Sequence, residues 1–149
     1  METTFEGIIS FAIEKENEAA EIYKSMSSLV KKPSAKTMFN ELAAEEIKHR
    51  ELLEGVTEEK VPDVQLKKVT DLKISDYLVD ISFKSDMEYQ DILIMAMKRE
   101  ESSVRLYNDM ATKLRNPKLQ KLLKFMAQEE AKHKLRLETE YDKNVLKED

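Results

Sequence analysis

Four long segments of the chain carry apolar residues at steps of three and four, which is the spacing of one buried face of an α-helix. These segments cover approximately the residues 3–30, 34–54, 86–115 and 117–141. The first face runs Phe5, Ile9, Ala12, Tyr23 and Met26, with one polar interruption. No comparable stretch alternates with the period of two that a half-buried strand requires. The pattern predicts an all-α fold of four helices in a single domain, residues 1–149.

Residues that favour helix ends lie at the borders of these segments. A hydroxyl at Thr3 or Thr4 suits the first cap, and Pro33 suits the first position of the second helix. Gly55 follows the second segment, where a C-terminal cap is expected. The third helix is predicted to begin at a capping box formed by 85–88, and Asn116 and Pro117 open the fourth.

The region 56–85 does not continue the helical pattern. It contains Pro62 and a polar stretch, although 74–81 is compatible with a short helix. A connection of this length is unusual between neighbouring antiparallel helices and favours a crossover along a helical bundle. An apolar strip in it would suit a homodimer contact: Tyr77, Leu78, Ile81 and Phe83.

Composition narrows the classes of function. The 149 residues include no Cys, which excludes disulfides and thiolate metal sites within this chain. The net charge is −5, with 25 basic and 30 acidic residues interleaved, so we expect no nucleic-acid partner. No apolar run approaches the ~18 residues of a membrane span, and Glu6 and Glu14 interrupt the N-terminal stretch. We expect a cytoplasmic protein that does not contact membranes.

The two histidines of the chain lie in two copies of one motif, Glu45–His49 and Glu129–His133. A shift of 84 residues places one copy on the other, and 12 of the 43 aligned positions from Ala12 to Glu54 are then identical. Such a repeat predicts two similar halves, each a helical hairpin.

Six polar residues interrupt the apolar faces, three in each half. Glu16 and Glu46 are 30 residues apart, as are Glu100 and Glu130, and the predicted turns lie midway between them. Residues equidistant from a turn lie level in an antiparallel hairpin, here roughly 22 Å from it. A Glu and a His at i and i+3 reach one centre. We therefore predict that six residues meet: Glu16, Glu46, His49, Glu100, Glu130 and His133.

Four carboxylates in an apolar core would repel one another, and each would lose several kcal/mol of hydration. Two divalent cations would cancel that charge. Carboxylate oxygen with imidazole nitrogen suits iron, or manganese, rather than the metals that favour thiolates. The sequence predicts a site for two iron ions, with manganese as the alternative.

The order Glu, Glu-x-x-His, Glu, Glu-x-x-His on four helices resembles the rubrerythrin branch of the ferritin-like di-iron carboxylate proteins. The resemblance implies a ferritin-like four-helix bundle in which the six residues are metal ligands and Glu46 and Glu130 bridge the two metals. It also implies an oxidoreductase that reduces hydrogen peroxide or dioxygen. Family members commonly dimerise.

Two departures from the family pattern bear on activity. Rubrerythrins usually carry a cysteine-bearing rubredoxin domain, so electrons here are expected from a separate protein such as a rubredoxin. The family also carries a further glutamate three residues after the ligand of the third helix, where this chain has Ser103. Glu101 is the candidate to replace it.

Other readings remain open. The protein could be a non-catalytic iron-binding or iron-handling ferritin-like protein, or an adaptor bundle in which the polar cluster is vestigial. Glu18, Glu45, Glu101 and Glu129 fall off the apolar faces and are expected to be solvated. Tyr23 and Tyr107 follow Glu16 and Glu100 by seven residues, so they either fill the core or hydrogen-bond a ligand carboxylate.

Overall fold

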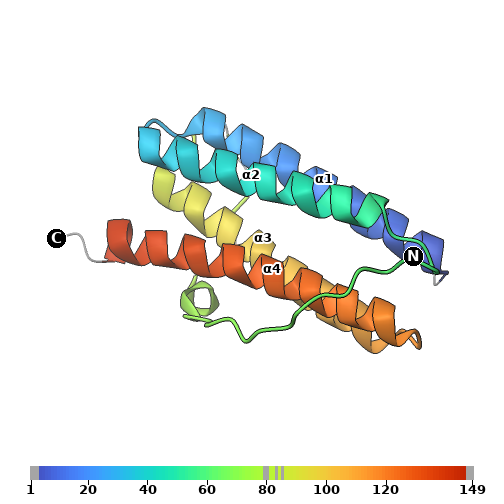
Figure 1. Cartoon of the computed structure of the whole chain (residues 1–149). Coiled ribbons are helices and arrows are strands. Elements are labelled where there is room, and N and C mark those ends of the chain that lie inside the picture. Colours follow the sequence, from blue (N-terminus) through green and yellow to red (C-terminus); the bar gives the residue numbers. More distant parts are fainter. Residues whose placement is uncertain (1–3, 79–80, 83, 85, 147–149) are drawn as a thin grey trace. The chain divides into compact units, whose positions relative to one another are not determined.

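The computed structural model describes residues 4–78, 81–82, 84 and 86–146, and they form two compact helical units (Figure 1). The first unit, Met1–Pro62, contains α1 (Phe5–Leu29) and α2 (Pro33–Glu54). The second unit, Asp63–Asp149, contains the 3₁₀ turn η1 (Ile74–Tyr77), α3 (Tyr89–Thr112), α4 (Pro117–Tyr141) and the short π-helix η2 (Asp142–Leu146). The described residues form no strand beyond one isolated bridge, between Thr57 and Lys60, so the predicted all-α class is confirmed.

The first unit is an antiparallel hairpin of α1 and α2. The Thr4 hydroxyl accepts a hydrogen bond from the Gly7 N–H at 3.0 Å, as predicted for the cap. Pro33 opens α2, and Gly55 ends it. The Tyr23 and Phe39 rings stack with their centroids 6.0 Å apart, which joins the apolar faces of the two helices.

The second hairpin differs from the prediction at both ends of α3. The predicted capping box is wrong, because α3 begins at Tyr89 and its cap, Glu88, makes no side-chain cap hydrogen bond. Ser85 lies outside the described residues. The helix ends at Thr112, three residues before the predicted Arg115. The start of α4 is as predicted: the Asn116 side chain accepts hydrogen bonds from the N–H groups of residues 118 and 119 at 3.0 and 3.2 Å.

Within the second unit, the described part of the long connection from Asp63 to Leu78 runs beside α4 and in the same direction (Figure 1). Four contacts place it. From first to last they are Asp63 with Lys121, Lys67 with Gln128, Asp71 with Lys134, and Ser75 with Glu138. We call the residues 63–78 the strap. Because the strap covers α4, this helix is buried on a second face besides the predicted one, including Gln128, Lys134 and Glu138.

The apolar strip proposed for a homodimer is only partly described. Tyr77 is 87% exposed, Leu78 and Ile81 are partly exposed, and Phe83 lies outside the described residues. A dimer contact there stays a prediction. Within the described ranges, no helix combines the length and the apolar character that a membrane span needs.

Candidate metal centre

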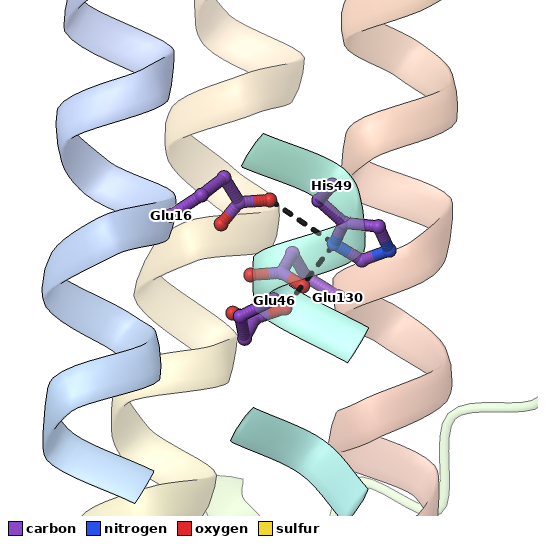
Figure 2. A group of neighbouring side chains, drawn as sticks. All are labelled: Glu16, Glu46, His49 and Glu130. Carbon is purple, nitrogen blue, oxygen red and sulfur yellow. Dashed lines mark hydrogen bonds and ion pairs between the residues drawn. The ribbon is translucent and has the colours of Figure 1, made fainter. Parts of the chain in front are cut away.

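In the first unit, Glu16 on α1 meets Glu46 and His49 on α2 (Figure 2). His49 Nδ1 lies 3.1 Å from Glu16 Oε1 and 3.2 Å from Glu46 Oε1. Glu16 and Glu46 are 1% and 0% exposed, and His49 is 8% exposed. One ligand atom from each residue lies within 4.8 Å of the others. We call these residues the first triad.

The second unit repeats the arrangement 84 residues later. His133 Nδ1 lies 2.9 Å from Glu100 Oε2 and 3.3 Å from Glu130 Oε1. All three side chains are buried, with exposures of 2%, 0% and 4% for Glu100, Glu130 and His133. We call these three residues the second triad. In it, Glu100 of α3 meets the Glu-x-x-His motif of α4, as the sequence predicted. That the six residues bind metal stays a prediction.

The donor set and the spacing in both triads fit a metal ion. Ligand atoms bound at roughly 2.1 Å and at right angles about one ion lie about 3 Å apart. The distances from the histidine nitrogens to the carboxylate oxygens are 2.9–3.3 Å. Each triad also combines two carboxylates with one imidazole, which suits iron or manganese.

The neighbouring glutamates are not among the residues whose ligand atoms gather in the triads. Glu18 and Glu45 are exposed, as predicted. Glu129 is not solvated as predicted: its side chain is only 19% exposed and pairs with Lys132 at 2.8 Å. Glu101 is not placed as a replacement ligand, because its carboxylate accepts a hydrogen bond from Ser75 Oγ at 2.5 Å and belongs to neither triad. That hydrogen bond lowers the pKa of Glu101, against the effect of burial, and nearby cations including Lys98 lower it further.

Tyr23 and Tyr107 are both buried, at 3% and 1% exposure. Tyr23 stacks on Phe39, which supports its role in core packing. A hydrogen bond from either hydroxyl to a ligand carboxylate stays a prediction. Ser103, at the position of the family's further glutamate, is partly exposed on α3.

A charged cluster that the sequence did not predict lies beside the second triad. Lys134 Nζ lies 2.7 Å from Asp71 Oδ1 and 3.1 Å from Glu138 Oε2, and Ser75 N–H donates to Glu138 Oε2 at 3.0 Å. Burial alone would lower the pKa of Lys134, but its hydrogen bonds to Asp71 and Glu138 raise it. Burial would raise the pKa of Asp71, but the bond from Lys134 and the backbone N–H of Lys73 lower it.

One sequence signal could have found this cluster. Lys134 and Glu138 are spaced i, i+4 on the flank of the ligand face, and their repeat counterparts are Arg50 and Glu54. A charged pair with this spacing in both halves indicates that its two members lie on the same face of the helix in each half. It does not reveal that the strap covers only the second pair.

Comparison with known families gives one finding that covers most of the chain. The family model described as Rubrerythrin matches residues 7–141. Comparison with curated proteins and with solved structures gives no match. The matched range includes all six triad residues, and the four long helices are those of the ferritin-like four-helix bundle that the sequence predicted. On this match, which spans both hairpins, the chain belongs to the rubrerythrin family.

Proposed function

We propose that the two triads hold two iron ions, or two manganese ions, in a di-metal centre that reduces hydrogen peroxide or dioxygen. The observation that carries the proposal is the duplication of one buried donor set, two carboxylates and one imidazole, in both hairpins. Membership of the rubrerythrin family supports a di-iron carboxylate protein. The electrons come from a separate donor protein such as a rubredoxin.

The chain's own residues would bind the ions, orient them and keep water out. Glu16 and His49 would serve one ion, Glu100 and His133 the other, and Glu46 and Glu130 would be shared between them. Each histidine faces its carboxylates with Nδ1, so this nitrogen would be the ligand and must carry no proton while the ion is bound. Such a centre supplies two electrons, and with two protons these convert one peroxide molecule to two of water.

A second candidate function is iron binding or handling without fast turnover. Ser103 favours it, because it stands where the family carries a glutamate and Glu101 is held by Ser75. On this candidate the same six residues bind iron reversibly, and peroxide is consumed slowly. A third candidate, an adaptor bundle with vestigial polar residues, requires that the triads bind no metal. A cytoplasmic location stays part of the proposal.

The test begins with the metal content of protein purified without added metal, followed by anaerobic titration of Fe(II) into the metal-free protein. About two ions per chain are expected for both metal-binding candidates. Peroxide is then added with a reduced rubredoxin, and rapid oxidation of the rubredoxin supports the oxidoreductase. Stoichiometric binding with slow oxidation supports iron handling instead. Without stoichiometric metal in either measurement, the proposal fails and the adaptor reading stands.

A further inference from the structure

The repeat provides an internal comparison of the two triads. The position of Lys134 corresponds to Arg50, and that of Glu138 to Glu54. In the first hairpin the pair is open to solvent, with side-chain exposures of 31% for Arg50 and 53% for Glu54 and a separation of 3.8 Å. In the second hairpin the exposures are 8% and 0%, and the separation is 3.1 Å.

The strap accounts for this difference. It brings Asp71 to Lys134 and the backbone N–H of Ser75 to Glu138, and neither contact has a counterpart among the described residues of the first unit, which does not include the strap. There, Arg50 donates to Asn17 of α1 at 2.9 Å in an exposed hydrogen bond. The corresponding positions are held by an exposed link in the first half. In the second half they are held by a network that is buried at Lys134 and Glu138 and reaches the surface at Asp71.

Ser75 joins both ligand-bearing helices of the second hairpin. Its N–H donates to Glu138 on α4, and its hydroxyl donates to Glu101 on α3. Glu101 directly follows the triad residue Glu100. Lys134 directly follows His133 and is bonded on both sides. The network therefore restrains α3 next to one ligand and α4 next to another.

Restraint of this kind affects metal affinity. Groups that orient the ligands of a metal typically change its affinity by about 10–100-fold, because a preorganised site loses less conformational freedom on binding. The two triads have the same donors at nearly the same spacing, and the contacts of the strap lie beside the second triad only.

We propose that the strap, through Asp71 and Ser75, holds Lys134 and Glu138 so that the second triad is preorganised and binds its metal ion more tightly than the first triad does. The inference rests on the proposed metal binding. On this proposal, four residues position the ligands through α3 and α4 without binding the metal: Asp71, Ser75, Lys134 and Glu138. The two ions would load in a fixed order, the ion at Glu100 and His133 first.

The experiment measures Co(II) binding alone, in the absence of oxygen, by visible absorption. Each triad is studied in the full chain after the opposite histidine is removed: His49→Ala leaves the second triad intact, and His133→Ala leaves the first. The second triad is expected to bind Co(II) at least about tenfold more tightly. Equal affinities, or a tighter first triad, would overturn the proposal.

Variants of the strap contacts then separate positioning from general stability. Glu138→Gln and the milder Asp71→Asn should each weaken Co(II) binding about tenfold in the His49→Ala chain, and less than about twofold in the His133→Ala chain. Asp63→Asn is the matched control, since it removes an exposed contact of the strap to Lys121. Equal weakening of both triads would mean that the strap has a structural role only.

These outcomes are distinct from failure of the proposed function. If the unaltered chain binds no stoichiometric metal, the metal site itself is wrong. If it binds two ions but the variants show no preference for one triad, the site stands and the preorganisation by the strap is wrong.

Discussion

Glu54 and Glu138 occupy the same position in the two repeats, yet the Glu54 side chain is 53% exposed and the Glu138 side chain is fully buried. Each lies four residues after a basic partner, Arg50 or Lys134. Both copies of the repeat carry the charged pair, and the strap covers only the second pair. In water such a pair contributes little, whereas a buried carboxylate depends on its partners.

Replacing these two glutamates should therefore have unequal effects. Glu138→Ala leaves Lys134 buried with one partner fewer and the Ser75 N–H without its acceptor, so we expect a loss of about 3 kcal/mol in the free energy of unfolding. Glu54→Ala should change it by less than about 0.5 kcal/mol. Urea denaturation of the metal-free proteins measures both, and equal losses would contradict the contrast.

The helices and the triads could be predicted because one physical pattern specifies each of them. The apolar faces specify four helices, and the interruptions by Glu16, Glu46 and His49 fall on those faces at matched distances from a turn. Local caps were less reliable. Thr4 and Asn116 cap as predicted, but the box at 85–88 does not, since α3 begins only at Tyr89.

The strap could not be predicted because its order comes from tertiary contacts and not from a periodic pattern. Asp71 is polar and exposed, and nothing in its neighbourhood in the sequence indicates a contact with Lys134, 63 residues away. For the same reason the sequence alone leaves Glu101 as a candidate ligand, whereas in the structure its carboxylate accepts a hydrogen bond from Ser75 Oγ. Contacts between an irregular segment and a helix face have no signature in the sequence.

Two adjacent glutamates test the first triad with a matched control. Glu46 is buried in the triad and Glu45 is exposed. Glu46→Gln should reduce the metal content below two ions per chain, because the amide replaces a charged ligand, while Glu45→Gln should retain the full content. Mass spectrometry of the metal-loaded proteins measures this. Full content in Glu46→Gln would remove Glu46 from the ligand set.

The same substitution should have the opposite effect on the metal-free protein. Glu46 and Glu16 are buried around one histidine, so replacing one carboxylate by a neutral amide removes repulsion and a desolvation penalty. We expect Glu46→Gln to raise the stability of the metal-free protein by about 1 kcal/mol. Thermal unfolding in the presence of a chelator measures the change, and a clear loss of stability would show that Glu46 stabilises the fold without metal.

Added metal should separate these proteins further. An ion that binds only the native state raises the melting temperature, by an amount equivalent to about 2.7 kcal/mol at a hundredfold excess over its Kd. The unaltered chain and Glu45→Gln should show this rise with Fe(II) under anaerobic conditions, and His133→Ala should show a smaller one. Melting curves with and without metal measure it. A rise of the same size in His133→Ala would place the ion elsewhere.

The contact of the strap with α4 should weaken in acid. The folded pKa of Asp71 is below its ordinary value of 3.8, so the stability contributed by this carboxylate is present above about pH 4 and is lost as the pH falls through the folded pKa. Lys134 has a raised pKa, so its contribution persists through neutral pH and is lost only in strong base, as the pH rises through the raised value.

The pH dependence is best measured as a difference between two chains. Metal-free Asp71→Asn should melt below the unaltered chain between about pH 5 and pH 8, and the gap should narrow below about pH 4, where the unaltered chain also loses the charge. The protonation of other groups cancels in this difference. The Asp63 side chain is 97% exposed, so Asp63→Asn should have almost the same melting temperature as the unaltered chain at each of these pH values. A gap that stays constant into acid would mean that Asp71 acts through its shape and not through its charge.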